Sequence, residues 1–126
     1  MKLLDTTVAV DYLRGSRAAV ALLTGLQDSL DEIVASELVR FELLAGARER
    51  ELDQLEHFLA ALGWVPVNGK VARLGGELAR RYRPSHGGIE DVDYLIAATA
   101  LLLEADLLTT NVKHFPMLEG LAPAYG

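Results

Sequence analysis

The sequence contains no cysteine in its 126 residues, which excludes a disulfide scaffold and a thiolate-bound zinc site. It has no excess of positive charge either. Twelve basic and eighteen acidic residues give a net charge of −6, which disfavours a protein that coats nucleic acid through bulk charge. A signal peptide and an apolar run near the roughly 20 residues of a membrane span are both missing. We therefore expect a cytoplasmic protein that meets any nucleic acid locally or through bound cations.

What the sequence does have is enough apolar material for one core. Hydrophobic residues make up 51% of the chain, and its length is that of one ordinary domain, so we predict a single domain over residues 1–126. Apolar strand-like segments alternate with helical patterns. Because parallel neighbours need crossover connections, this alternation predicts an α/β fold with a mainly parallel central sheet and helices on both faces.

The segment boundaries follow from apolar periodicity and from the residues that interrupt it. The predicted strands are residues 1–4, 33–35, 64–67 and 107–110, with an edge strand around 121–125. The predicted helices are residues 8–13, 18–26, 37–45, 49–62, 71–82 and 94–103. Ser36 is a suitable N-cap for the helix that begins at Glu37. The helix over 94–103 is apolar on nearly every side, so we expect it in the interior.

Polar residues stand where these apolar segments begin or end. Asp5 follows the first strand, Asp91 and Asp93 open the apolar helix, and Asn111 follows the strand over 107–110. Carboxylates at the edge of a core are costly unless a cation meets them. For Asp5 a local interpretation stays open, because this residue or one of the threonines after it can cap the first helix. Asp11, farther into that helix, is predicted to lie on the surface.

Two further acids are placed by helical geometry. Glu42 projects roughly 140° away from Glu37, which marks the solvent side of its helix, so Glu42 points towards the interior. The alternative is a buried ion pair with an arginine. Asp91 and Asp93 diverge by roughly 200° on a helix, so only one can face the interior. We predict that Asp93 does, because the small residues Ala97 and Ala100 share its face.

Convergence of these acids would create a strongly anionic pocket. In a parallel sheet ligands bind beyond the carboxyl ends of the strands, where Asp5 and Asn111 are predicted to lie. Like charges at about 4 Å repel by several kcal/mol at an effective dielectric constant near 20. Mg²⁺ or Mn²⁺ would relieve this repulsion, since hard divalent ions take oxygen ligands. Zinc is disfavoured without cysteine or paired histidines.

At these residues the chain resembles a known family. Asp5 in LLDTTVAVDYLRG, Glu42 in VRFELLAGA, Asp93 in VDYLIAATA and the segment TTNVKHF are similar to the four motifs of PIN domains, most closely those of VapC toxins. The resemblance implies a Mg²⁺- or Mn²⁺-dependent endoribonuclease, usually a homodimer, that a VapB antitoxin inhibits. It also implies that Asp5, Glu42 and Asp93 bind the metal.

The fourth motif departs from the family pattern, which often has aspartate where this chain has Asn111. The amide still offers a neutral oxygen, but losing the charge should weaken a second metal. Thr110 is expected either to position a metal-bound water or to be only a strand residue. The predicted reaction is hydrolysis of an RNA phosphodiester by metal-activated water. Asp93 or Glu42 would also orient that water.

Two other functions remain possible from the sequence. The first is a PIN-like binding module for protein or RNA, whose acids bind basic side chains without catalysis. The second is an aspartyl-phosphate switch on Asp5, which lacks a second aspartate at Thr7 and leaves Glu42 unexplained. Arg80, Arg81 and Arg83 form a basic cluster that either contacts a phosphate backbone or complements a helix C-terminus. His86 and His114 are predicted to be solvated or structural.

Overall fold

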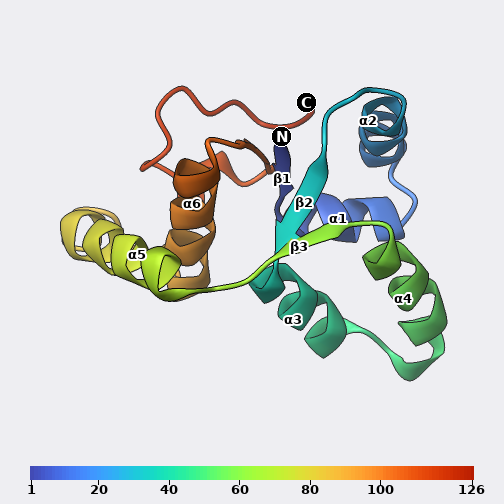
Figure 1. Cartoon of the computed structure of the whole chain (residues 1–126), viewed down its shortest axis with the longest axis horizontal. Helices are drawn as coiled ribbons and strands as arrows, with labels where there is room; N and C mark the ends of the chain where they lie inside the picture. Colours follow the sequence, from blue (N-terminus) through green and yellow to red (C-terminus); the bar gives the residue numbers. More distant parts are fainter.

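A parallel sheet of four strands organises the chain, as the computed structural model of residues 1–126 shows (Figure 1). The strands are β1 (Lys2–Leu4), β2 (Ile33–Ser36), β3 (Gly63–Val65) and β4 (Asp106–Leu108). Their order in the sheet is β3-β2-β1-β4, and every neighbouring pair is parallel. In β1, Leu3 pairs with Val34 on one side and with Leu107 on the other. The predicted α/β class and parallel sheet are confirmed.

Six α-helices connect and cover the strands. They are α1 (Thr6–Leu13), α2 (Arg17–Gln27), α3 (Glu37–Gly46), α4 (Leu52–Ala60), α5 (Gly69–Tyr82) and α6 (Asp91–Leu103). Two short 3₁₀ helices, η1 (Glu49–Glu51) and η2 (Val112–His114), complete the chain. None of the helices combines the length and the apolar character that a membrane span needs.

The strand order places helices on both faces of the sheet. The chain moves from β1 to β2 to β3 in one direction across the sheet, and then returns from β3 to β4 at the other edge. Because crossovers are right-handed, the reversal puts α5 and α6 on the face opposite to α1 and α2. Figure 1 shows this arrangement, with α5 and α6 on the left of the strands and α1, α2 and α4 on the right.

The core is built around β1 and α6. Leu3 and Leu4 of β1 are fully buried, and α6 is buried along most of its length, from Tyr94 to Ala100. A helix without a polar face is stable only in such an interior, so the sequence-based prediction for α6 is confirmed. Gly75 allows α5 to lie against this helix, because a Cβ atom there would come within 2.9 Å of the Leu95 side chain.

Two strands end earlier than the periodicity predicts. β3 ends at Val65 because the next residue, Pro66, has no amide hydrogen for the ladder. β4 ends at Leu108 and not at Thr110. The amides that follow β4 donate to hydroxyl groups instead: Thr110 N–H donates to Thr7 Oγ1, and Asn111 N–H donates to Thr109 Oγ1. These side-chain acceptors replace the ladder at the carboxyl end of β4.

The predicted edge strand around residues 121–125 is wrong. The tail is irregular, and one backbone hydrogen bond ties it to the end of β4, from Ala124 N–H to Thr109 O at 2.8 Å. A side chain anchors it as well, since Tyr125 Oη donates to Asp11 Oδ2 at 2.6 Å. Asp11 is therefore half-buried under the tail and does not lie free on the surface as predicted.

Candidate functional site

The candidate site lies at the carboxyl ends of β1 and β4, the neighbouring strands between which the direction of the chain across the sheet reverses. Crossovers leave to opposite faces at this point, so a crevice opens beyond the strand ends. Asp5 follows β1 directly, and Thr109 follows β4. The site is therefore placed by topology before any side chain is considered.

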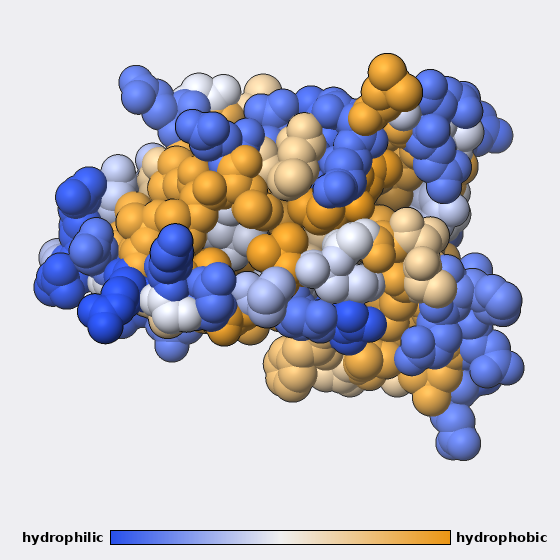
Figure 2. Space-filling model, viewed as in Figure 1, coloured by the Kyte–Doolittle hydropathy of each residue, from blue (hydrophilic) through white to orange (hydrophobic).

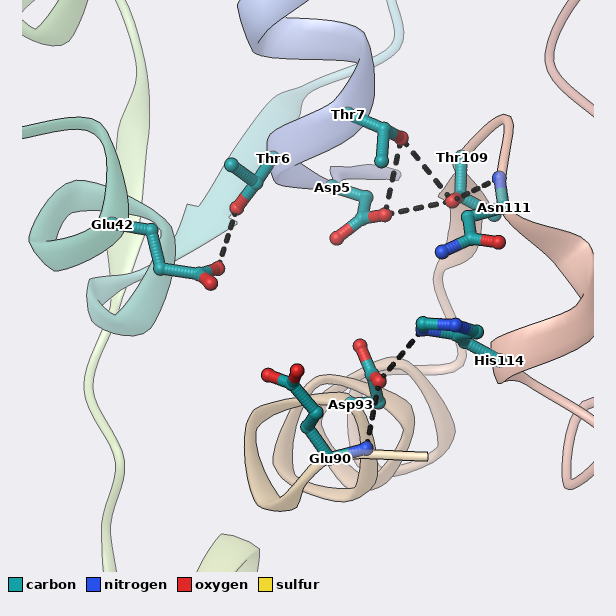
Figure 3. A network of polar contacts seen from close by, with 9 residues as sticks. All are labelled: Asp5, Thr6, Thr7, Glu42, Glu90, Asp93, Thr109, Asn111 and His114. Atoms are coloured by element: carbon teal, nitrogen blue, oxygen red, sulfur yellow. Dashed lines mark hydrogen bonds and ion pairs between the residues drawn. The ribbon is translucent and has the colours of Figure 1, made fainter. Parts of the chain in front are cut away.

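Asp5 is buried, with 5% of its surface exposed, and hydroxyl groups hold one of its oxygens. Oδ2 accepts hydrogen bonds from Thr109 Oγ1 at 2.7 Å and from Thr7 Oγ1 at 3.2 Å (Figure 3). Asp5 occupies the N-cap position of α1, but its side chain makes no capping hydrogen bond. The local interpretation as a helix cap is wrong, and Oδ1 of Asp5 is left without a protein donor.

Thr109 is the link between Asp5 and the chain after β4. It is fully buried, and its hydroxyl both donates to Asp5 and accepts from Asn111 N–H at 3.0 Å. Thr7 Oγ1 and Thr109 Oγ1 are 3.3 Å apart, which closes a small hydroxyl network around Asp5. Sequence reasoning named Thr110 and missed Thr109. The side chain of Thr110 makes no hydrogen bond, and only its amide joins this network.

Glu42 reaches the same space from α3. Its Oε1 accepts from Thr6 Oγ1 at 2.7 Å, and no arginine pairs with it, so the alternative of a buried ion pair is wrong. Burial raises the pKa of Glu42 above its ordinary value, and the nearby charges of Asp5 and Asp93 raise it further. The hydrogen bond from Thr6 acts in the opposite direction but does not cancel them. An inward carboxylate is therefore present, as the helical geometry predicts.

Asp93 points inward from the first turn of α6, as predicted, and Asp91 turns outward to Arg83. Asp93 Oδ2 accepts the backbone N–H of Glu90 at 3.1 Å and lies 3.0 Å from His114 Nδ1. Burial is the largest influence on Asp93 and raises the pKa of its carboxyl group. Asp5 raises this pKa further, whereas the Glu90 amide and His114 lower it.

These acids come from three separate elements and face one open space. Figure 3 shows Asp5 from above, Glu42 from one side, and Glu90 and Asp93 from below, all directed towards the same region. No lysine or arginine forms a salt bridge with any of them. The charges of Asp5, Asp93 and Glu90 raise the pKa of Glu42, and the charge of Asp5 raises the pKa of Asp93, so these carboxylates lie within electrostatic reach across this space.

His114 and Glu90 belong to this site, although sequence reasoning placed neither there. His114 is not simply solvated, because its ring is paired with Asp93. One feature of the sequence points to it. Asn111 and His114 are three residues apart, which is the repeat of a 3₁₀ helix, and they are the N-cap and the last residue of η2. Glu90 contributes its charge to the site from the N-cap of α6.

The donor set suits a hard divalent cation better than any other ligand. The groups that face the open space include one oxygen each of Asp5 and Asp93, the carboxyl group of Glu90 and the side-chain amide of Asn111. As the side chains are placed, no three of the acids and histidines lie close enough together to ligate one ion directly. Mg²⁺ does not require this, since it is commonly held by one or two carboxylates and keeps several waters.

The comparisons with known proteins identify the family of the chain. The family model described as "PIN domain" matches residues 2–118. The chain is 64% identical over 125 residues to "Ribonuclease VapC19" of Mycobacterium tuberculosis, an alignment that covers 99% of this chain and all of that protein. "Ribonuclease VapC10" of the same organism is 38% identical over 125 residues, which cover 99% of this chain and 93% of that protein.

A solved structure agrees as well. The chain is similar to a chain of the VapBC2 complex from Rickettsia felis bound to a promoter DNA fragment, with a TM-score of 0.81 and 26% identity. The match covers 97% of this chain and 96% of that one. The resemblance that the four sequence motifs indicate is therefore confirmed. On the family match and on the identity to these relatives, this chain is a member of the PIN domain family.

Proposed function

We propose that this protein is a Mg²⁺- or Mn²⁺-dependent endoribonuclease and the toxin of a VapBC-type toxin–antitoxin system. The observation that carries the proposal is the convergence of Asp5, Glu42 and Asp93 on one space, where none of them forms a salt bridge with a lysine or an arginine. The names of the two relatives support the ribonuclease activity, and the VapBC complex supports the toxin role.

Asp5 and Asp93 are the residues that would hold the metal ion directly. Glu42, on which the charges of both aspartates act, would hold it through water. When bound, the ion lowers the pKa of a coordinated water and stabilises charge on the phosphoryl oxygens and the leaving group. Burial is the main cause of the raised pKa values of Glu42 and Asp93, and a cation bound between these groups would lower both values.

The protein's own contribution is to fix each acid before any ion arrives. One oxygen of Asp5 is held by Thr7 and Thr109, and one oxygen of Asp93 is held by the Glu90 amide and His114. The other oxygen of each carboxylate is left for a ligand. Such preorganisation reduces the cost of ordering side chains when substrate and ion bind. Asn111 adds a neutral amide beside this pair, and Thr110 is proposed to position the attacking water.

The proposed partners follow from the same comparisons. The antitoxin is a VapB-type protein, and we infer that the toxin itself is a homodimer that has no membrane association and acts in the cytoplasm. Co-expression with a VapB-type protein, if one is encoded next to the gene, tests the antitoxin: the two chains should co-purify, and the complex should lose the ribonuclease activity. The mass of the isolated toxin in solution tests the dimer.

The decisive experiment is cleavage of a cellular RNA pool with and without MgCl₂ or MnCl₂, with the new ends mapped. The wild-type protein should cut at defined positions only when the ion is present. Asp5→Asn and Asp93→Asn should each lower the cleavage rate by more than about a hundredfold while leaving the circular dichroism spectrum unchanged. Asp106→Asn, at the other end of the sheet, is the matched control. Full activity in either site variant would refute the proposal.

A further inference from the structure

The basic charge of this acidic protein is concentrated on one helix. Residues 69–83, which comprise α5 and the next residue, contain five of the twelve basic residues and a single acid, Glu77. This segment therefore has a net charge of +4, and the rest of the chain has a net charge of −10, which together give the total of −6. A helix that opposes the net charge of its own protein is expected to face an anionic partner.

Three of these side chains form one face of α5. At 100° per residue, Arg73, Arg80 and Arg83 lie within about 80° of one another, on the side away from the buried Val71 and Leu78. We call these three residues the arginine face. Arg73 and Arg80 form no salt bridge, and Arg83 pairs only with the exposed Asp91. In Figure 2 the most hydrophilic residues gather at the left of the molecule, where Figure 1 places α5.

A groove runs between this face and α6. It has a volume of about 570 Å³, and its lining includes Gly75, Gly76, Arg80, Arg83 and Tyr94. Gly76 has no atom within 4 Å of the position where a Cβ would stand, so the floor is open between the arginines. The groove is thus wide enough for a phosphate group and bordered by two guanidinium groups.

Tyr94 supplies a second, independent observation. Its side chain is 1% exposed, and its hydroxyl is the only buried side-chain polar atom in the protein without a hydrogen-bond partner. An unsatisfied buried hydroxyl costs about 1–3 kcal/mol, so a phenylalanine would be the more stable choice. The Arg83 guanidinium lies over the same ring, 5.4 Å from its centroid. Tyr94 lines the groove together with Arg80, Arg83 and Asp91, so a phosphate group that displaces the side chains covering the hydroxyl would accept a hydrogen bond from it.

The groove and the acidic site share one helix turn. Tyr94 follows Asp93 directly, and the two side chains diverge by about 100°, so they face neighbouring sides of α6. A helix with its side chains is about 10–12 Å across. That distance corresponds to roughly three nucleotides at the 3.4 Å rise of a stacked strand. A polynucleotide cut at the acidic site would therefore have its flanking phosphates within reach of the groove.

We propose that the arginine face and the α5/α6 groove bind the sugar–phosphate backbone of single-stranded RNA next to the cleaved bond. The inference rests on the proposed function, since it takes the acidic site as the place of cleavage. It also resolves how a protein with a net charge of −6 holds a polyanion: the contact is local and confined to one helix.

The test measures binding separately from cleavage. A labelled single-stranded RNA of mixed sequence is titrated with protein in EDTA, and fluorescence anisotropy reports the affinity over a range of KCl concentrations. Arg73→Gln with Arg80→Gln should weaken binding by about tenfold. Loss of two phosphate contacts should also reduce the slope of log K against log salt by about 1.4, at 0.7 per contact on a single strand.

The matched control carries the same charge change elsewhere. Arg17→Gln with Arg50→Gln removes two exposed arginines that form no salt bridge, so both double variants have the same net charge. The control should keep the affinity and salt slope of the wild type. Equal weakening in the two double variants, or unchanged affinity in the arginine-face variant, would overturn the proposal and leave the face to another anionic partner such as an acidic protein.

Tyr94→Phe tests the role of the hydroxyl in RNA binding separately from its effect on stability. Removing an unsatisfied buried hydroxyl should raise the melting temperature in the absence of RNA and weaken RNA binding by about threefold. Cleavage assays on the same preparations distinguish the two proposals. Wild-type protein that binds RNA through the arginine face but cuts nothing would contradict the proposed function only, whereas active protein with an unaffected arginine-face variant would contradict this inference only.

Discussion

The acidic residues at the two ends of the sheet differ in whether lysine or another ammonium group pairs with them. At the amino end, Lys2 Nζ lies 2.8 Å from Asp106 Oδ2, and the ammonium group of Met1 lies 3.0 Å from Asp31 Oδ1. Asp31 and Asp106 thus each have a basic partner on a neighbouring segment. The hydrogen bond and charge of Lys2 hold the pKa of Asp106 below its ordinary value. This end of the sheet is electrostatically complete within the chain itself.

At the carboxyl end the acids have no such partner. Burial raises the pKa of both Glu42 and Asp93, and their neighbours at the site are hydroxyl groups, one amide and the imidazole of His114. The same chain has arginines and lysines available and places them elsewhere. This difference is what the proposed function requires of a site that binds a cation from outside the protein.

The largest expected effect is stabilisation by metal. An ion that binds only the folded state adds about 2.7 kcal/mol at a concentration 100 times its Kd. Thermal unfolding in MnCl₂ and in EDTA should show this gain for the wild type and for Asp106→Asn. The double variant Asp5→Asn with Asp93→Asn should show none of it. An equal gain in this double variant would place the ion elsewhere.

The next effect concerns the network that holds Asp5. Thr109→Val keeps the shape of the side chain but removes a hydroxyl that donates to Asp5 and accepts from the Asn111 amide. We expect a loss of about 2 kcal/mol in the free energy of unfolding, because a buried amide and a buried carboxylate both lose a partner. Urea denaturation measures it, with Thr24→Val on the exposed side of α2 as the control. Equal values for the two variants would contradict the network.

The stability of the protein should depend on pH in opposite directions at the two ends of the sheet. Glu42 has a raised pKa in the folded state, so the folded protein binds more protons than the unfolded chain, and stability falls as the pH rises from the ordinary value through the raised one. Asp106 has a lowered pKa, so its contribution is lost as the pH falls through that value. Melting temperatures in EDTA between about pH 2 and 8 test both, since the contribution of Asp106 is lost only below its ordinary pKa.

Glu42→Gln should flatten the decline above the ordinary pKa of glutamate by less than about 1 kcal/mol, since the carboxyl group is only partly buried and water screens it. Asp106→Asn should leave that decline unchanged. A steeper decline in Glu42→Gln would show that this carboxylate stabilises the folded state at neutral pH, which is the opposite of what its surroundings imply.

The part of the site that the sequence predicts depends on local geometry. The position of Asp5 follows from a strand that ends there, and the inward direction of Glu42 follows from the period of a helix that Ser36 caps, with Leu38 N–H donating to its hydroxyl at 3.1 Å. Parallel strands bring their carboxyl ends to one edge, which is why residues far apart in the chain could be expected to meet.

The rest depends on contacts between distant segments. The Thr109 hydroxyl donates to Asp5, which is 104 positions away in the sequence, and the Tyr125 hydroxyl donates to Asp11, which is 114 positions away. Neither pairing leaves a periodic trace in the sequence. The same long-range bonds explain the errors: hydroxyl acceptors take over from the ladder after Leu108, and a single side chain anchors the tail where a strand was predicted.

The smallest effect tests the amide that replaces the family's usual acid. Asn111→Asp adds a fourth carboxylate beside Asp5 and Asp93, so in EDTA the variant should lose less than about 1 kcal/mol of stability through like-charge repulsion. In MnCl₂ the same charge should increase the affinity or the number of ions bound, which isothermal titration calorimetry measures. Asn68→Asp is the matched control, because Asn68 caps α5 by accepting from Val71 N–H at 3.0 Å and aspartate fills that role as well. If both variants bind Mn²⁺ as the wild type does, then position 111 lies outside the reach of the ion, and the proposed ligands are limited to Asp5, Glu42 and Asp93.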